Sequence, residues 1–413
     1  MAGQAAFVRE FLRERATILI NGRLRGDPLS RLHLDEGRID PYPLYEQVRA
    51  AGPLTLSRLG VFTTADHAIC DQVLRDRRFG VGGRVVDDTA ELSFLEMNPP
   101  DHTRLRRLAA PSFSPRTIAG FDATITSVVR DLLDRVPTGR PFDLVTDFAA
   151  PMPIAVISEL LGIPDADAEE FSRYGTVFGS ALGGLQSLQH ASQLLDARKQ
   201  LQRIFTRLFD LKRSEPGDDV ISRLVAAEGD KVRPEEMVPL CTLLLIAGFE
   251  TTVNLIGNTS LALLRHPEAW HRVAADPDLA TAAIEETLRY DAPVQRTGRM
   301  ALDDVEIAGR IVRKGEYVVT LLGGANRDPK VFDRPARFDL DRANANDHLG
   351  FSSGIHYCVG APLAKLEARI AIQELTQRFG NLAMIKPGRR RPGSLIRGMS
   401  SFPVVGYPVL ARA

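Results

Sequence analysis

Cysteine is scarce in this chain of 413 residues: only Cys70, Cys241 and Cys358 occur, and they lie far apart. Three scattered cysteines cannot form the disulfide framework of a secreted protein, so we expect a protein of the reducing cytoplasm. The chain also lacks a charge imbalance, because 52 Lys and Arg residues accompany 52 Asp and Glu residues. Proteins that bind nucleic acid normally carry a basic excess, so this balance argues against a nucleic-acid partner.

Long hydrophobic runs are missing as well. The first thirty residues carry Arg9, Glu10 and Arg13 and contain no apolar segment typical of a signal peptide. The most apolar run, Leu240 to Phe249, has about ten residues, roughly half of what a helix needs to cross a bilayer. We therefore expect a soluble protein without a membrane anchor.

Helical periodicity is the main feature that the sequence does contain. Apolar spacing, with Pro and Gly at the ends, predicts helices over residues 43–50, 115–136, 153–161, 165–178, 186–213 and 234–265. Strand patterns predict a hairpin at 54–57 and 61–64 and strands within 294–301, 305–317 and 394–405, whereas 79–88 has the composition of an irregular loop. No repeat or linker divides the chain. We predict one mainly α-helical domain over residues 1–413, with small β-sheets and a long central helix.

The most informative stretch surrounds Cys358. Residues 351–360 read Phe-Ser-Ser-Gly-Ile-His-Tyr-Cys-Val-Gly and end where a helix is predicted to begin. A thiolate at Cys358 would face helix N-terminal amides, which lower the pKa of a cysteine. Gly354 and Gly360 have no side chain to obstruct a flat ligand, and His356 could donate a charge-assisted hydrogen bond to an anionic group on that ligand.

This stretch resembles the haem-ligand loop Phe-x-x-Gly-x-His-x-Cys-x-Gly of the cytochrome P450 family, with Phe351 as its first residue. The resemblance implies that Cys358 is the axial thiolate of haem b, where it favours cleavage of the O–O bond. Position 352 is Ser, where many family members have Gly. A c-type haem would require Cys-x-x-Cys-His, which is absent. For Cys70 and Cys241 we predict only buried apolar packing.

A second motif, Ala-Gly-Phe-Glu-Thr-Thr, occupies residues 247–252 in the longest predicted helix. By itself the motif fits a buried helix whose Thr hydroxyls bond the preceding turn, although Gly costs up to about 1 kcal/mol relative to Ala. In the family this pattern opens a groove for dioxygen. The resemblance implies that Ala247 and Gly248 lie beside the haem, that Thr251 hydrogen-bonds the bound oxygen, and that Glu250 belongs to the proton-delivery chain.

Four basic residues match positions that bind the haem propionates in the family. His102 and Arg106 are four residues apart and share one helical face, an arrangement that by itself is equally compatible with an ordinary protein surface. The resemblance implies that both residues bind a propionate, together with Arg299 on a strand and His356 in the cysteine loop.

Glu286 and Arg289 are three residues apart on one predicted helix. Such pairs are usually exposed salt bridges worth a few tenths of a kcal/mol. The family closes a Glu–Arg–Arg network with a second arginine further along the chain, and the resemblance assigns that position to Arg337. The implied role of this network is structural.

The resemblance implies a haem-thiolate monooxygenase that inserts one oxygen atom from O2 into a lipophilic small molecule by hydroxylation or epoxidation. The haem domain occupies the whole chain, so a separate ferredoxin and ferredoxin reductase would supply the electrons. A peroxygenase or isomerase on the same fold and a haem-containing ligand sensor without turnover are the alternatives. The presence of both Glu250 and Thr251 argues against them.

Two surfaces are predicted with less detail. Substrate-contact regions of the family correspond here to Leu244 on the long helix and to residues 81–95, 294–298 and 399–402, which are mainly apolar. A local basic patch near the cysteine would suit an acidic ferredoxin, although a generic solvated surface is equally compatible. The residues of this predicted basic patch are Arg104, Arg107, Lys365 and Arg369.

Overall fold

The computed structural model describes residues 2–82, 92–180 and 187–408, and its architecture is mainly α-helical with small sheets, as predicted. The helices are α1 (Ala2–Leu19), α2 (Pro28–Leu32), α3 (Asp35–Ile39), α4 (Tyr42–Ala51), α5 (His67–Arg75), α6 (Asp101–Ala109), α7 (Pro115–Ala119), α8 (Asp122–Arg135), α9 (Pro151–Leu161), α10 (Asp165–Gly179), α11 (Leu188–Ser214), α12 (Val220–Ala226), α13 (Pro234–Arg265), α14 (Pro267–Ala275), α15 (Leu279–Tyr290), α16 (Leu322–Ala325) and α17 (Ala361–Arg378).

The strands are short. They are β1 (Thr55–Leu56), β2 (Phe62–Thr64), β3 (Phe79–Gly80), β4 (Pro141–Asp143), β5 (Thr297–Ala301), β6 (Val305–Ile307), β7 (Arg310–Val312), β8 (Tyr317–Thr320), β9 (Asn381–Met384), β10 (Arg389–Arg390), β11 (Met399–Ser401) and β12 (Pro403–Tyr407). The largest sheet has the order β1-β2-β8-β5-β3, and a second sheet has the order β4-β12-β9. The pairs β6-β7 and β10-β11 form two smaller hairpin sheets.

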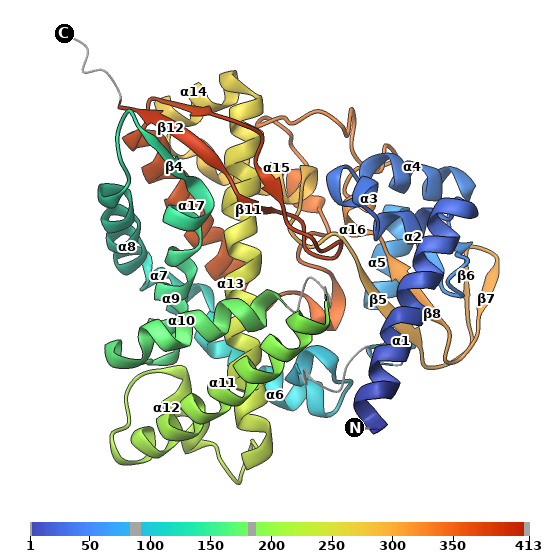
Figure 1. Cartoon of the computed structure of the whole chain (residues 1–413), viewed down its shortest axis with the longest axis horizontal. Helices are drawn as coiled ribbons and strands as arrows, with labels where there is room; N and C mark the ends of the chain where they lie inside the picture. Colours follow the sequence, from blue (N-terminus) through green and yellow to red (C-terminus); the bar gives the residue numbers. More distant parts are fainter. Residues whose placement is uncertain (1, 83–91, 181–186, 409–413) are drawn as a thin grey trace.

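Helix α13 runs through the whole molecule and organises the helices around it (Figure 1). Its 32 residues have the predicted bounds, with Pro234 in the first turn, where a missing N–H costs nothing. The backbone N–H of Arg233 donates to Glu236 at 2.9 Å and satisfies one of the groups at the helix start. Helices α9, α10, α15 and α17 pack against it.

Three predicted segments differ from the structure. The helix predicted over 115–136 is divided into α7 and α8 at Gly120 and Phe121. The loop predicted over 79–88 begins with a strand, because Phe79 pairs with Ala301 in the largest sheet; residues 83–88 lie outside the described residues. The segment 305–317 folds as the β6-β7 hairpin followed by β8, since Ala308 and Gly309 adopt positive φ angles and reverse the chain.

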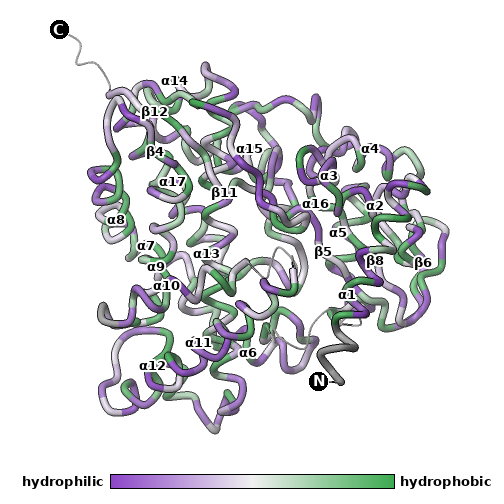
Figure 2. The backbone as a smooth tube through the Cα atoms, in the orientation of Figure 1, coloured by the Kyte–Doolittle hydropathy of each residue, from purple (hydrophilic) through white to green (hydrophobic). Residues whose placement is uncertain are grey.

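The main hydrophobic core surrounds α13 and extends across the helical half of the molecule. On the outside, α11 alternates between hydrophilic and hydrophobic residues and buries one face, as its periodicity predicts (Figure 2). Two helical stretches, Leu144–Leu161 and Pro234–Arg265, are long and apolar enough to cross a membrane, a longer span than the run of about ten residues seen in the sequence. Their most apolar windows are 67% and 83% buried inside the fold, which is typical of core helices.

Candidate active site

The middle of α13 has one face that the surrounding protein leaves uncovered. From Leu240 to Leu263 every residue is buried except Ala247, Gly248 and Thr251. Thr251 follows Gly248 by three positions and Ala247 by four, so the three residues lie on the same side of the helix. A core helix exposes such a face only where the fold leaves space for something other than its own side chains. The three residues are those that the sequence motif assigned to the haem side.

The two threonines of the motif have different surroundings. The Thr251 hydroxyl donates to the carbonyl oxygen of Ala247 at 2.7 Å, one turn back along the helix. Thr252 is buried and lies against Glu367 of α17. The side chain of Glu250 is 4% exposed and forms an ion pair with Arg391 at 2.7 Å. Burial raises the pKa of Glu250, and the charge of Arg391 opposes that rise.

The cysteine loop consists of a short 3₁₀ turn, Gly354–His356, that leads directly to α17. The Cys358 N–H donates to the Phe351 carbonyl at 3.0 Å and closes the loop. Burial raises the pKa of the Cys358 thiol, whereas hydrogen bonds from the Gly360 and Ala361 amides and the charge of Arg106 lower it. The predicted helix amides are therefore present, but burial outweighs them. A metal cation bound at Cys358 would supply the missing stabilisation, because coordination deprotonates a thiol.

The other two cysteines behave as predicted. Cys70 and Cys241 are fully buried within apolar clusters, and burial raises the pKa of each thiol. Buried, protonated thiols act as small hydrophobic side chains.

The two glycines of the loop serve different purposes. Gly354 has a φ of +67°, and a Cβ there would lie 2.3 Å from the carbonyl oxygen of Leu74 on α5. No side chain fits at this position, so Gly354 allows the loop to dock on α5. A Cβ at Gly360 would make only ordinary contacts, the nearest at 3.9 Å to Phe113. Packing of the chain itself therefore does not require glycine at 360.

We expect Gly354→Ala to destabilise the protein much more than Gly309→Ala. Gly309 has a similar φ of +74°, but a Cβ there would meet no atom within 4 Å. Gly309→Ala therefore measures only the free-energy cost of placing a non-glycine residue in the left-handed conformation, about 1–2 kcal/mol. Gly354→Ala adds overpacking and should cost roughly 1–3 kcal/mol more. Denaturant unfolding of both variants, with the haem-to-protein ratio, measures the difference. Equal unfolding midpoints for the two variants would show that α5 moves to accommodate the added Cβ without loss of stability.

Four basic side chains gather beside the cysteine loop. The rings of His102 and His356 lie 4.4 Å apart, both ring nitrogens of His102 and Nε2 of His356 are buried without a hydrogen-bond partner, and Arg299 is only 4% exposed. Arg106 donates to the carbonyl of Tyr357 at 2.5 Å. Burial, together with the charges of Arg299 and Arg106 and the nearby His102, lowers the pKa of His356 to about 3. Burial lowers the pKa of Arg299 to about 10.

This basic cluster lacks its counter-charge. Within residues 2–82, 92–180 and 187–408, no carboxylate interaction accompanies any of its four members. Buried cations and unpaired imidazole nitrogens are costly unless an anion compensates them. A dianionic group, such as a pair of propionates, satisfies both requirements.

The predicted site residues therefore form two groups. His102, Arg106, Arg299 and His356 gather around the Cys358 loop, and the motif of α13 forms the second group with its uncovered face. An uncovered face in the core, a cysteine at a loop–helix junction and an uncompensated basic cluster fit a flat, dianionic, metal-containing cofactor. These are the features that a haem-thiolate site requires.

Comparison with known proteins identifies the family. The cytochrome P450 family model matches residues 71–386. The cytochrome P450 monooxygenase PikC of Streptomyces venezuelae is 37% identical over 386 residues, covering 88% of this chain and 91% of that protein. The chain belongs to the cytochrome P450 family and is an enzyme of the P450 monooxygenase class.

Two crystal structures support the same assignment. Ligand-free CYP164A2 of Mycobacterium smegmatis matches with a TM-score of 0.84 and 40% identity, over 92% of this chain and 99% of that chain. P450BioI, in complex with an acyl carrier protein ligated to hexadec-9Z-enoic acid, also has a TM-score of 0.84, with 36% identity over 90% of this chain and 100% of that chain.

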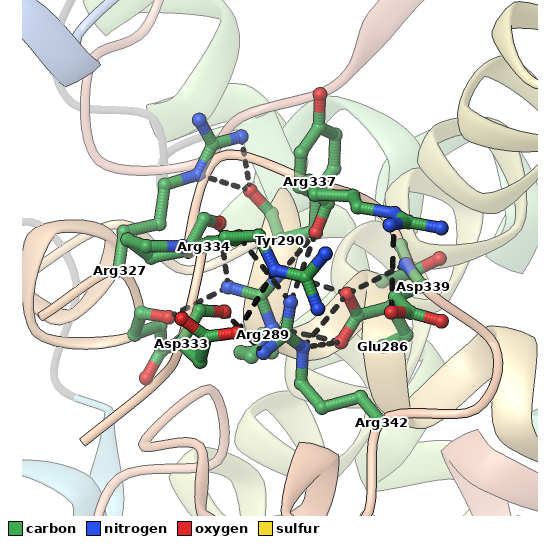
Figure 3. Close-up of polar contacts among 12 residues, drawn as sticks. Glu286, Arg289, Tyr290, Arg327, Asp333, Arg334, Arg337, Asp339 and Arg342 are labelled. Atoms are coloured by element: carbon green, nitrogen blue, oxygen red, sulfur yellow. Dashed lines mark hydrogen bonds and ion pairs between the residues drawn. The ribbon is translucent and has the colours of Figure 1, made fainter. Parts of the chain in front are cut away.

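The Glu–Arg–Arg network is present, but its third member is Arg342 and the assignment of Arg337 was wrong (Figure 3). Glu286 and Arg289 are fully buried and form two hydrogen bonds of 2.7 Å. The Nε of Arg342 lies 3.1 Å from both carboxylate oxygens of Glu286. The guanidinium of Arg337 is 59% exposed and lies 3.9 Å from Asp339, so this residue contributes only its backbone carbonyl, which accepts from Arg289.

The residues of the predicted basic patch are mostly neutralised by neighbouring carboxylates. Arg104 pairs with Glu236 and Asp101, Lys365 with Glu285 at 2.6 Å, and Arg369 with Asp122 at 2.9 Å. Arg107 is exposed. Three of the four predicted cations are therefore not free, and the idea of a free basic patch is not supported.

Sequence reasoning missed two neighbours of the site. Val294 forms an antiparallel bridge with Ile396, which precedes the predicted 399–402 segment; Met399 and Phe402 instead lie in the main core. Arg391, which pairs with Glu250, was also not predicted. A partner more than a hundred residues away leaves no periodic signal. In the predicted 81–95 region, residues 83–91 lie outside the described residues.

Proposed function

We propose that the protein inserts one oxygen atom from O2 into a lipophilic small molecule, by hydroxylation or epoxidation. The cofactor is haem b, with Cys358 as its iron ligand and with His102, Arg106, Arg299 and His356 at its propionates. Phe351, Gly354 and Gly360 shape the loop on the cysteine side. In this proposal residues 1–413 act as one haem domain in the cytoplasm.

The observation that carries this proposal is the uncovered face of α13, which holds the Thr251 hydroxyl, with the buried Glu250 at the preceding position of the same helix. When bound, the haem supplies the redox-active iron that activates O2. The chain supplies the protons: the Thr251 hydroxyl donates and accepts at Oγ1, and the buried Glu250 carboxyl provides an ionisable group one residue away. Ala247 and Gly248 leave room beside them. A protein that only sensed ligands, or that used peroxide, would not need this pair.

The substrate-contact positions favour an apolar ligand. Leu244 and Ile396 are buried, and Val294 packs against an apolar cluster. Apolar lining with a few polar groups is typical of pockets for lipophilic molecules. P450BioI, which shares this fold, is known with an acyl chain on its carrier protein. Fatty acyl chains, terpenoids, steroids and polyketides therefore form the first screening set.

A separate ferredoxin with its reductase supplies the electrons in this proposal. The loop before Cys358 exposes Ile355 and Tyr357, which are 38% and 44% accessible. Together with the paired charges of Arg104, Lys365 and Arg369, this surface favours an electron partner that binds through apolar contacts and less through long-range charge attraction.

The proposal is tested with purified haem-loaded protein, a surrogate ferredoxin and reductase, and a compound that shifts the haem spectrum in the screen. Product should carry one atom from labelled O2 per NAD(P)H. Thr251→Ala should keep the spectrum and consume NAD(P)H, but it should divert electrons to hydrogen peroxide and lower product per NAD(P)H severalfold, because a positioned proton donor is lost.

Thr252→Ala is the matched control. One residue along a helix turns the side chain by about 100°, and Thr252 lies in the core, so product per NAD(P)H should stay near the wild-type value. If Thr251→Ala formed as much product per NAD(P)H as the wild type, Thr251 would have no role in proton delivery. Product formed only with added peroxide, and never with NAD(P)H, would overturn the monooxygenase proposal.

A further inference from the structure

The charge that faces Glu250 comes from the C-terminal hairpin. Arg391 directly follows β10, and its Nη1 lies 2.7 Å from Oε1 of Glu250. Its Nε donates to Oδ1 of Asn254 at 3.0 Å, and Nδ2 of Asn254 donates to the backbone carbonyl of Glu250 at 2.8 Å. The guanidinium therefore binds a carboxylate and an amide one turn apart on α13. Because both acceptors are buried, this arrangement fixes the rotamer of Glu250.

The C-terminal hairpin packs closely against α13. A Cβ at Gly398 would lie 1.8 Å from Oδ1 of Asn254, so only glycine lets the hairpin approach this closely. The Arg391 N–H donates to the Gly398 carbonyl at 3.1 Å and places Arg391 opposite that glycine. One turn further along α13, Asn258 donates to the carbonyls of Asp291 and Arg397 at 2.9 and 3.0 Å. Two asparagines of α13 thus hold the hairpin in position.

Arg391 also lines a pocket that opens to solvent. The hairpin residues that line it include Arg390, Arg391, Gly393, Ser394 and Gly398. The side chain of Arg391 is 21% exposed, whereas that of Glu250 is 4% exposed. Arg391 therefore links a surface pocket to a carboxylate that is nearly buried.

We propose that Arg391 is the positioning residue of proton entry: it lines this hairpin pocket and holds the Glu250 carboxylate, through which protons from the pocket side reach the Thr251 face of α13. This inference rests on the proposed function. A proton from pocket water binds an Oε atom of Glu250, which then releases a proton to water or hydroxyl at Thr251. Each proton that leaves is replaced from solvent, and no electron moves.

The effect of Arg391 on the pKa of Glu250 can be distinguished from the effects of the other neighbouring groups. Burial raises the pKa of Glu250; Arg391 and then Asn254 lower it. Among the described neighbours, α9 contributes the apolar Ile157 beside Gly248, and α10 contributes Gly179 beside the Cβ of Glu250. Glu367 of α17 faces Thr252 instead. Arg391 is thus the charge whose loss shifts Glu250.

The experiment titrates the carboxyl C=O infrared band of Glu250 in the resting haem-loaded protein, with the band assigned by its loss in Glu250→Gln. Arg391→Gln removes the opposing cation, so Glu250 stays protonated to higher pH, by about one to three pH units. Arg391→Lys keeps a cation and should retain the wild-type midpoint. Arg389→Gln is the matched control, because this exposed hairpin arginine binds Ser400 and not α13.

The same variants are then compared for product per NAD(P)H as a function of pH. If product formation needs protonated Glu250, product per NAD(P)H declines as the pH rises through the pKa of Glu250. In Arg391→Gln this decline should occur at higher pH than in the wild type. In Arg391→Lys it should occur at the wild-type pH. The reduced carbon monoxide spectrum checks folding, and Arg391→Met, which keeps an apolar stem, replaces Arg391→Gln if that variant fails to load haem.

Each outcome decides one claim. An unchanged infrared midpoint in the variant without a cation at 391 overturns the electrostatic role. A shifted midpoint with an unchanged coupling profile overturns proton entry at the hairpin. A wild type that titrates at Glu250 but forms no product with NAD(P)H overturns the proposed function and leaves the Arg391 contact standing.

Discussion

Cys358→Ser should abolish the thiolate-type Soret band of the reduced carbon monoxide complex. A serine hydroxyl has no stable anion at neutral pH and cannot replace a thiolate on iron. The loop would remain closed, because its hydrogen bond runs from the backbone N–H of residue 358 to the carbonyl of Phe351. The measurement is the difference spectrum of the reduced protein, normalised to bound haem.

Cys70→Ser and Cys241→Ser are the controls for this loss. Both thiols are fully buried in apolar clusters, so a hydroxyl there costs stability but leaves the ligand untouched. Their carbon monoxide complexes should keep the thiolate-type band. If Cys358→Ser kept the band, or if either control lost it while retaining haem, the assignment of the iron ligand would be wrong.

Arg342→Ala should destabilise the protein far more than Arg337→Ala. Glu286 is fully buried, Arg342 is 6% exposed, and the two are joined by contacts of 3.1 Å to both carboxylate oxygens. Removing one partner of a buried ion pair leaves charge uncompensated and costs about 3–5 kcal/mol. The Arg342 side chain also holds the carbonyl of Asp333 at 2.7 Å, so its loss loosens the segment before the cysteine loop.

Arg337→Ala provides the matched comparison. Its guanidinium is 59% exposed and 3.9 Å from an aspartate, an interaction worth less than about 1 kcal/mol. Denaturant unfolding followed by far-ultraviolet circular dichroism should place Arg342→Ala far below wild type and Arg337→Ala near it, with haem retention following the same order. The reverse order would restore Arg337 as the third member of the network.

These arginines show how far sequence reasoning reaches. Glu286 and Arg289 are three residues apart on one helix, so their pairing follows from helical geometry alone. The third member lies on an irregular segment, where backbone direction changes at nearly every residue. Two arginines five positions apart were both available, and only the folded path of the chain shows that Arg342 turns inward while Arg337 turns outward.

The basic patch and the proton chain depended on folding in the same way. Lys365 and Arg369 were predicted as free cations because a sequence shows charges but not their partners. In the fold, their carboxylates come from α15 and from the first turn of α8. The Arg391 that faces Glu250 is likewise distant in sequence, since a long side chain can reach any element that packs nearby.

By itself, the sequence determined the features that are encoded within one turn or one loop. The bounds of α13 follow from its apolar periodicity and its terminal residues. The Cys358 loop and the residues of the uncovered face were recognised from motifs of six to ten residues that resemble those of the family. Only the tertiary structure decided which side chains neutralise or position them. Arg342, Arg391 and the carboxylates beside Lys365 and Arg369 meet their partners through packing of distant elements, and the physical cause is burial: a charge removed from water must find a counter-charge wherever the fold brings one within reach.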